Sequence, residues 1–258
     1  MNDTASSLLT TSRVMKRFGG LTAVKPLTMD VRRGALYGLI GPNGAGKTTI
    51  FNLLTGVYQP TEGEIHFDGA RIDRRKPYEI TRRGLARTFQ NIRLFADMSV
   101  LENVMSARHL RSRQVLTDAL LGTSRHHQDE AETRQRSLEL LKIFALDGVA
   151  DAPATSLSYG NQRRLEIARA LATDPKMLLL DEPAAGMNPQ ESLDLMRLIR
   201  WLRDELALTI LLVEHNMKVV MGICETVQVI DYGETIAVGT PAEIQKHPKV
   251  IEAYLGGG

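Results

Sequence analysis

The segment from Gly41 to Thr48 constrains the fold more than any other part of this sequence. It reads Gly-Pro-Asn-Gly-Ala-Gly-Lys-Thr, in which two glycines separated by four residues are followed by Lys-Thr. The apolar run Leu36–Ile40 before it predicts a strand, and Thr48–Leu54 predicts a helix. This pattern binds phosphate when it joins a strand to a helix, whereas a chance glycine turn beside a lysine is the disfavoured alternative.

Phosphate chemistry explains each residue type in this loop. Small residues let backbone N–H groups close around phosphate oxygens, and the helix N-terminus adds positive partial charge. We expect the Lys47 ammonium to neutralise phosphate charge and the Thr48 hydroxyl to hold Mg²⁺. The residues expected to bind nucleotide here are Gly41, Pro42, Asn43, Gly44, Ala45, Gly46, Lys47, Thr48 and Thr49.

A second apolar run, Met177–Leu180, ends in two carboxylates, Asp181 and Glu182. A buried strand of a parallel sheet carries the residues at its C-terminal end to the edge where ligands bind. Asp181 is then placed to hold Mg²⁺, and Glu182 to activate the attacking water as general base. A strand that simply enters a solvated loop is the alternative, which the phosphate loop disfavours.

A third motif, Leu157-Ser-Tyr-Gly-Asn-Gln-Arg-Arg164, precedes a predicted helix at Leu165–Leu171. The Ser158 hydroxyl and the Gly160 backbone lie at a helix N-terminus, where phosphate binds favourably. Serine is also a common N-cap, so the motif by itself fits a plain helix start. Its position just upstream of the Asp181-Glu182 strand favours the phosphate-binding interpretation.

Together the three motifs resemble those of the ABC ATPases, in which two domains pair head to tail and each signature motif closes on the partner's ATP. Asn161 lies in the signature motif with Ser158 and Gly160. The resemblance implies that Gln90 contacts Mg²⁺ and the attacking water, that His215 contacts the γ-phosphate, and that Phe18 stacks on adenine. Ordinary surface, structural and core roles are the respective alternatives.

Three positions depart from the common pattern of the ABC ATPases. Tyr159 stands where the signature has a second glycine, Asn161 where it usually has glutamine, and Asn188 where aspartate is common. None of these changes removes a phosphate ligand or the general base. The resemblance therefore implies an active ATP hydrolase that uses ATP and Mg²⁺.

The resemblance covers nearly the whole chain and is most similar to the ATP-binding subunit of branched-chain amino acid importers. The segments that carry it are Arg17–Leu21, Arg87–Phe95, Tyr159–Glu166, Glu182–Pro189 and Gly239–Gly256. Urea or amide importers and the ATPase of lipopolysaccharide export share much of this pattern and remain alternatives. Soluble ABC ATPases of repair or translation, a nucleotide-binding regulatory module and a small-molecule kinase are less favoured.

The importer resemblance implies partners and a location. A second ATPase subunit is expected, usually a different related chain, together with two membrane subunits and an extracytoplasmic solute-binding protein reached through the complex. The chain is then peripheral, on the cytoplasmic face of the inner membrane. Apolar side chains near Gln90 offer a contact for the membrane subunit, although burial in a core fits them equally well: they are Phe89, Leu94, Phe95 and Met98.

The predicted fold is an α/β phosphate-loop NTPase of the ABC ATPase type. A mixed sheet core would carry an antiparallel β subdomain and an inserted helical subdomain. We place the core at 12–90 and 160–240, the helical subdomain at 91–159 and a C-terminal segment at 241–258. Residues 1–11 are expected to be loose, and Arg111–Gln128 to form a helix pair.

Charge and apolar patterning exclude several other classes of protein. The formal net charge is +2, from 32 basic and 30 acidic residues, so no basic footprint for nucleic acid is expected. A single cysteine excludes an internal disulfide. No apolar run approaches the roughly 20 residues of a membrane helix, so we expect any membrane role to come through partners.

Overall fold

The computed structural model of the chain describes residues 6–108 and 124–255. The helix pair expected at Arg111–Gln128 lies largely outside these residues. The chain divides into two compact units. One comprises Met1–Arg87 together with Lys176–Gly258, and the other comprises Thr88–Pro175.

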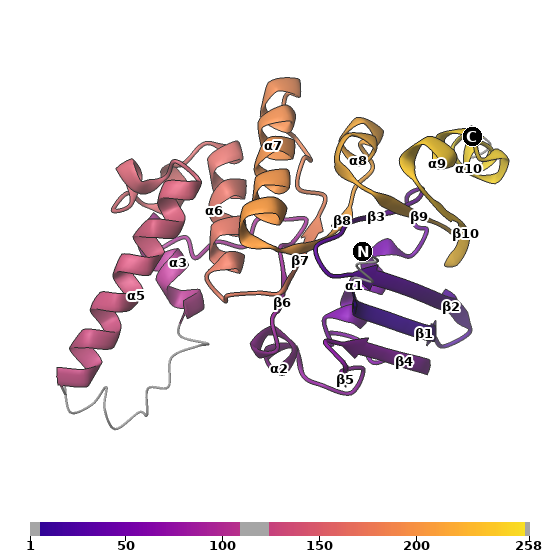
Figure 1. The fold of residues 1–258 in the computed structure, drawn as a ribbon, viewed down its shortest axis with the longest axis horizontal. Helices are drawn as coiled ribbons and strands as arrows, with labels where there is room; N and C mark the ends of the chain where they lie inside the picture. The colour runs from indigo at the N-terminus through magenta and orange to yellow at the C-terminus, as the bar shows by residue number, and fades with distance from the viewer. Residues whose placement is uncertain (1–5, 109–123, 256–258) are drawn as a thin grey trace, which may run out of the picture. The chain divides into compact units, whose positions relative to one another are not determined.

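The first unit contains a six-stranded sheet with the strand order β10-β9-β3-β8-β7-β6 (Figure 1). Its strands are β3 (Leu36–Ile40), β6 (Leu85–Arg87), β7 (Met177–Asp181), β8 (Thr209–Val213), β9 (Thr226–Asp231) and β10 (Glu234–Gly239). Neighbours from β9 through β6 are parallel, whereas β10 pairs antiparallel with β9. The mixed sheet expected from the sequence is confirmed, and β9 and β10 form a hairpin.

Three central strands of this sheet, β3, β7 and β8, are buried at every position. Their unbroken apolar runs suit strands of a parallel sheet that is covered on both faces. In the observed register Leu39 of β3 and Asp181 of β7 both pair with Val213 of β8. The C-terminal ends of all three strands therefore reach the same edge of the sheet.

A second, antiparallel sheet in this unit has the strand order β2-β1-β4-β5. Its strands are β1 (Ser7–Phe18), β2 (Leu21–Arg32), β4 (Glu62–Phe67) and β5 (Ala70–Arg71). The expectation that residues 1–11 are loose is wrong from Ser7 onward. Leu8 and Leu9 are buried, and β1 pairs with both β2 and β4, so this segment is held as a central strand.

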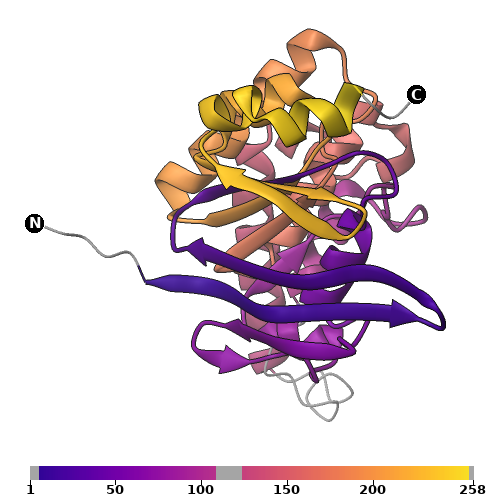
Figure 2. The same cartoon turned by 90° about the vertical axis from the view of Figure 1, so that its right-hand side faces the viewer.

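Helices cover both faces of the six-stranded sheet. Figures 1 and 2 show α7 (Pro189–Leu206), α8 (Met217–Ile223), α9 (Pro241–Lys246) and α10 (Pro248–Leu255) on one face, with α1 (Lys47–Leu54) and the antiparallel sheet on the other. The α1 side chains Ile50 and Phe51 belong to a buried cluster that includes Leu39 and Phe67 from the two sheets. The phosphate-loop helix is thus packed between the sheets. The short helix α2 (Pro77–Arg82) precedes β6.

Local capping explains where α7 begins. The sequence predicts a start at Glu191, whereas the helix begins at Pro189. The Asn188 side chain accepts from the backbone N–H of Glu191 (2.9 Å), and the Glu191 carboxylate accepts from the N–H of Asn188 (2.9 Å). This reciprocal cap, with proline at the first helical position, fixes the earlier start.

The second unit is helical. It contains α3 (Val100–Arg108), α5 (Ser124–Ile143), α6 (Tyr159–Leu171) and 3₁₀ turns at Asp147–Val149 and Ala154–Ser156. Because α6 packs against both α3 and α5, this compact unit reaches Pro175, beyond the 91–159 expected for a helical subdomain. Within the ranges 6–108 and 124–255, no helix is both long enough and apolar enough to cross a membrane.

Truncating a side chain near the N-terminus tests the structural role of β1. Leu9→Ala should lower the free energy of unfolding by about 2–5 kcal/mol, because Leu9 is fully buried and its loss leaves a cavity. Leu21→Ala is the matched control, since Leu21 is 67% exposed and should change stability by less than about 0.5 kcal/mol. Urea unfolding followed by circular dichroism measures both. Equal, small effects would show that β1 is not part of the core.

Candidate nucleotide-binding site

The loop between β3 and α1 follows a path that only glycine permits at two positions. A Cβ atom on Gly41 would lie 2.0 Å from the carbonyl oxygen of Ile230. Gly46 has a φ of +102°, and a Cβ atom there would lie 2.7 Å from the carbonyl oxygen of Ala23. Without side chains at these points the backbone can fold tightly enough to form a phosphate cradle.

Lys47 lies over this loop and near the two carboxylates predicted to take part in the chemistry. Its Nζ atom donates to the carbonyl oxygens of Gly41 (2.6 Å) and Pro42 (2.9 Å), and the residue is 7% exposed. Burial lowers the pKa of the ammonium group, while the charges of Glu182 and Asp181 act in the opposite direction. The fold therefore brings the motifs at 41–48 and 177–182 together.

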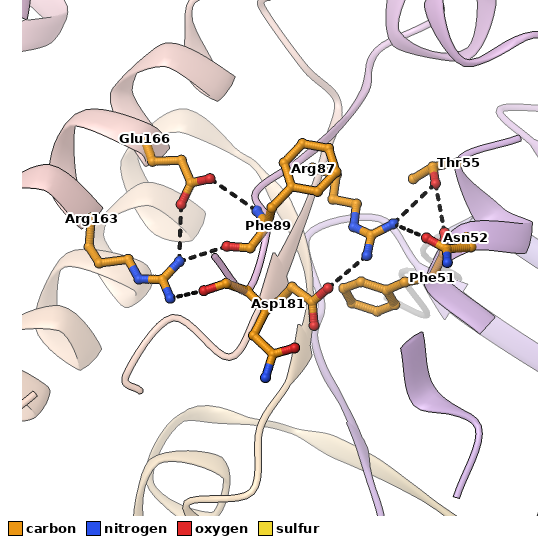
Figure 3. A network of polar contacts seen from close by, with 9 residues as sticks. Phe51, Asn52, Thr55, Arg87, Phe89, Arg163, Glu166 and Asp181 are labelled. Atoms are coloured by element: carbon orange, nitrogen blue, oxygen red, sulfur yellow. Dashed lines mark hydrogen bonds and ion pairs between the residues drawn. The ribbon is translucent and has the colours of Figure 1, made fainter. Parts of the chain in front are cut away.

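Asp181 forms a buried ion pair with an arginine on the neighbouring strand (Figure 3). Arg87 Nη2 lies 2.7 Å from Asp181 Oδ2, and the two side chains are 7% and 4% exposed. Both residues end their strands, β6 and β7, which pair in parallel. The planar guanidinium therefore fixes the direction of the Asp181 carboxylate.

Arg87 also reaches α1, the helix that follows the phosphate loop. Its Nη1 atom donates to Asn52 Oδ1 (2.7 Å), and its guanidinium carbon lies 5.3 Å from the centroid of the Phe51 ring. Arg87 lies in the segment Arg87–Phe95, which resembles branched-chain amino acid importers, but the sequence predicts no role for it. Its contacts depend on the pairing of β6 with β7, a long-range feature that no local sequence pattern predicts.

Glu182 and His215 come from different segments and lie side by side. His215 Nδ1 is 3.7 Å from Glu182 Oε2, and the side chains are 56% and 16% exposed respectively. Glu182 has a φ of +47°, an unusual conformation for a residue with a side chain. Its backbone N–H donates to the carbonyl oxygen of Val213, the last residue of β8 (2.8 Å). Two residues predicted to act on the attacking water and the γ-phosphate are thus adjacent.

Other predicted ligands occupy the start of α1 and the end of β1. Thr48 and Thr49 lie in the first turn of α1, where Thr48 is exposed. Phe18 ends β1 and is 41% exposed, with its ring 5.2 Å from the Tyr58 ring in an edge-to-face arrangement. Lys16 Nζ lies 5.0 Å from the centroid of the Phe18 ring. Phe18 therefore presents a partly exposed aromatic ring at the end of β1.

The C-terminal part of the chain packs beside the phosphate loop. The backbone N–H of Gly233, in the β9–β10 turn, donates to the carbonyl oxygen of Ala45 (2.9 Å). A cavity of about 840 Å³ is lined by Pro42–Ala45, by this turn, and by Lys249 and Glu252 of α10. Helix α10 is therefore a neighbour of the nucleotide-binding loop.

In the second unit, Ser158 caps α6. Its Oγ atom accepts from the backbone N–H of Asn161 (3.4 Å), and the side chain is exposed. Gly160 lies in the first turn of the same helix. The plain N-cap interpretation of this motif is confirmed, and the exposed position also suits a ligand that approaches the helix N-terminus.

Gln90 belongs to the same unit, where α6 holds its backbone. Arg163 donates from Nη1 to the carbonyl oxygen of Phe89 (2.6 Å) and from Nη2 to that of Gln90 (Figure 3 draws this network). Glu166 accepts from the backbone N–H of Phe89 (3.2 Å) and pairs with Arg163 (3.1 Å). Tyr159 stands where the common signature motif has glycine, and its hydroxyl oxygen accepts a hydrogen bond from Arg163 Nη2 (3.1 Å). Gln90 and the signature residues are thus linked within one unit.

Comparisons with known families agree with this geometry. The family model described as "ABC transporter" matches residues 24–185. A second model, "Branched-chain amino acid ATP-binding cassette transporter", matches residues 234–258. The first match spans the phosphate loop, the signature motif and both carboxylates. The second covers β10, α9 and α10.

Several known proteins and solved structures are similar to this chain over nearly its whole length. The chain is 46% identical to the high-affinity branched-chain amino acid transport ATP-binding protein LivG of Salmonella typhimurium, over 96% of this chain and 98% of that protein. It is also 46% identical to the high-affinity branched-chain amino acid transport ATP-binding protein BraF of Pseudomonas aeruginosa, again over 96% of this chain and 98% of that protein. The crystal structure of MJ1267 in its ADP conformation, an ATP-binding cassette, is 30% identical with a TM-score of 0.84, covering 97% and 99% of the two chains. A dimeric post-hydrolysis structure of the cassette MJ0796 with ADP and Pi is 27% identical with a TM-score of 0.77, covering 91% and 99%.

The buried Arg87–Asp181 pair can be tested by removing one partner and then both. Arg87→Met should lower the free energy of unfolding by about 3–5 kcal/mol, because it leaves the Asp181 carboxylate buried without its guanidinium. Arg87→Met/Asp181→Asn should lose clearly less, since the charge itself is gone. Urea titrations of the wild type, Arg87→Met, Asp181→Asn and the double variant measure the interaction free energy of the pair. Strictly additive losses would show that the pair contributes no interaction energy.

Proposed function

Because the chain belongs to the ABC transporter family, we propose that it is the ATP-hydrolysing subunit that drives import of branched-chain amino acids through partner membrane subunits. One observation supports the hydrolytic role above all others. Lys47, Asp181, Glu182 and His215 gather around the ends of β3, β7 and β8 within one unit. The names of LivG and BraF and the C-terminal family match support the cargo.

The first unit supplies the groups that hold the nucleotide. We propose that backbone N–H groups of residues 41–49 surround the phosphates and that the Lys47 ammonium moves from the loop carbonyls to phosphate oxygens. The Phe18 ring stacks on the adenine base. Both roles are supported by the glycine-dependent cradle and by the exposed face of Phe18.

The residues present also suit Mg²⁺. Within the described part of the chain, no three His, Cys, Asp or Glu side chains group into a metal site. Mg²⁺ is usually held by one or two carboxylates together with substrate phosphates, so such a group is not required. We propose that the Thr48 hydroxyl, the Asp181 carboxylate and the Gln90 amide are its protein ligands, and that the bound ion supplies charge neutralisation at the phosphates.

Hydrolysis then depends on the strained turn after β7. Glu182 accepts a proton from the attacking water while the water oxygen bonds to the γ-phosphorus and the bond to the bridging oxygen breaks, giving ADP and phosphate. His215 contacts the γ-phosphate beside it, and Gln90 helps to position the water. The 3.7 Å separation of His215 from Glu182 supports this division of roles.

The second unit acts on a partner's nucleotide. We propose that Ser158, Gly160 and Asn161 close on ATP bound to a second ATPase subunit, expected to be a different related chain. The dimeric MJ0796 structure supports pairing of cassettes, and the capped, exposed start of α6 supports phosphate contact. Closing of the pair moves two membrane subunits, which we propose contact the exposed side chains Phe95 and Met98.

The surroundings of the complex follow from the same proposal. The chain works at the cytoplasmic face of the inner membrane, and an extracytoplasmic solute-binding protein delivers the amino acid to the membrane subunits. Urea or amide import and lipopolysaccharide export are the remaining alternatives for the cargo. These alternatives differ in the cargo that is moved, so a transport measurement separates them.

Removing the proposed base tests hydrolysis and transport together. Glu182→Gln should keep nucleotide binding but lower kcat for ATP hydrolysis by about 10²–10⁴-fold, because the amide cannot accept the proton. ATP binding by fluorescence and phosphate release by the assembled complex measure the two steps. Wild-type turnover by the variant complex would show that Glu182 is not the base.

The same variant tests the cargo in cells. Labelled leucine uptake should be lost when Glu182→Gln replaces the only copy of this chain. If uptake persists although the purified wild-type complex hydrolyses ATP, the ATPase role stands and the branched-chain cargo is wrong. Urea, amides or exported lipids would then be measured in the same strains.

A charge placed in the signature motif separates its two possible roles. Ser158→Asp should still cap α6, since aspartate and serine cap equally well. A carboxylate facing a partner's triphosphate is unfavourable by several kcal/mol, so ATP hydrolysis by the complex should fall by at least about 100-fold. Ser158→Ala is the control, expected to lower stability by about 0.5–2 kcal/mol without adding charge. If Ser158→Asp hydrolyses ATP like the wild type, Ser158 is a cap only.

A further inference from the structure

Glu214 is a fully buried carboxylate directly after β8 and directly before His215. Its exposed fraction is 0%. Its Oε1 atom accepts from the backbone N–H of Ala184 (2.8 Å), and its Oε2 atom accepts from the N–H groups of His215 (3.2 Å) and Asn216 (3.2 Å). Both carboxylate oxygens are therefore engaged by backbone donors from two separate segments.

These two segments carry the groups assigned to hydrolysis. Ala184 lies two residues after Glu182, and His215 is itself one of the donors. The segments are already joined once, where the Glu182 N–H donates to the carbonyl oxygen of Val213 (2.8 Å). Glu214 adds a second connection, which reaches the chain at Ala184, two residues after Glu182. Together the two connections fix the turn that contains Glu182 against the turn that contains His215.

The physical cost of Glu214 argues for a specific role. Removing a carboxylate from water is expensive, and burial raises the pKa of Glu214 above its usual value. The N–H groups of Ala184 and Asn216 act in the opposite direction by stabilising the charged form. A buried apolar residue would avoid this cost, but it could not accept hydrogen bonds from both turns.

The geometry that Glu214 secures is not one the chain would adopt by default. Glu182 occupies a positive φ of +47°, which costs free energy and persists only where surrounding contacts impose it. The 3.7 Å approach of His215 Nδ1 to Glu182 Oε2 depends on the two turns keeping their spacing. Reacting groups displaced by about 1 Å can lose about 100-fold in rate.

We propose that Glu214 is a positioning residue that sets the spacing of Glu182 and His215 by binding the backbones of both turns. This inference rests on the proposed hydrolytic roles of those two residues. Glu214 does not touch the nucleotide. It acts through the residues that do.

Two variants of Glu214 test the proposal in the complex purified through a tag on this chain. Glu214→Gln places an amide NH₂ group against backbone donors, so one connection is lost. Glu214→Asp keeps the charge but is too short to span both turns. Either should lower kcat for ATP hydrolysis by about 100-fold while the affinity for ATP stays at its wild-type value. Asp73→Asn is the matched control, a buried carboxylate that accepts from Ile65 N–H (3.3 Å) away from this site, and it should leave kcat unchanged.

A double-mutant cycle gives the readout that a purely structural role would not produce. If Glu214 acts through His215, Glu214→Gln should cost much less in a His215→Ala background than in the wild type. Wild-type kcat in a folded Glu214 variant, or losses that multiply fully, would overturn the proposal. If Glu182→Gln itself keeps turnover, the proposed function fails first. If Glu182→Gln is inactive but the Glu214 variants are not, only the positioning role fails.

Discussion

Parallel pairing of β3 with β8 and of β8 with β7 determines where the chemistry of this molecule lies. Val213 pairs with both Leu39 and Asp181, so three strands end at the same level. The residues that follow these strands are the phosphate loop, the Asp181-Glu182 turn and the Glu214-His215 turn. A one-residue slip in this register would turn every side chain of the strand to the other face. Burial of all three strands at every position makes such a slip costly.

Buried ionic groups also position the residues around this edge of the sheet. Arg87 joins Asp181 to Asn52 on α1, so the carboxylate proposed to hold Mg²⁺ and the phosphate-loop helix share one guanidinium. In the helical unit Arg163 and Glu166 hold the backbone of Phe89 and Gln90 in the same manner. Both arginines bind fixed acceptors with a planar, forked cation, which gives directional control that lysine could not supply. Each unit thus orients its own functional residues through a buried arginine.

Sequence reasoning recovered the elements whose signals are local. The loop at 41–48 and the strand ending in Asp181 each carry their turn chemistry and apolar pattern in a few adjacent residues. The strand at Ser7–Thr11 was missed because Leu8 and Leu9 are adjacent and give no alternating pattern, and they become buried only when β2 and β4 pair with β1. The role of Arg87 was missed for the same reason, since its partner Asp181 is distant in sequence. No role for Glu214 could be predicted, because its carboxylate oxygens accept from backbone N–H groups, and every residue type except proline has such a group.

The start of α6 shows how a structural and a functional interpretation of one residue can hold together. A helix N-terminus presents four N–H groups without intrahelical partners, and the Ser158 cap uses that of Asn161. The Ser158 hydroxyl accepts this bond and still has its own proton to donate. Tyr159 departs from the common glycine, but its hydroxyl meets Arg163 one turn along the helix, with the Arg163 guanidinium 5.5 Å from its ring centroid. The aromatic side chain therefore lies along the helix, and the N-terminus keeps the donors that a phosphate group requires.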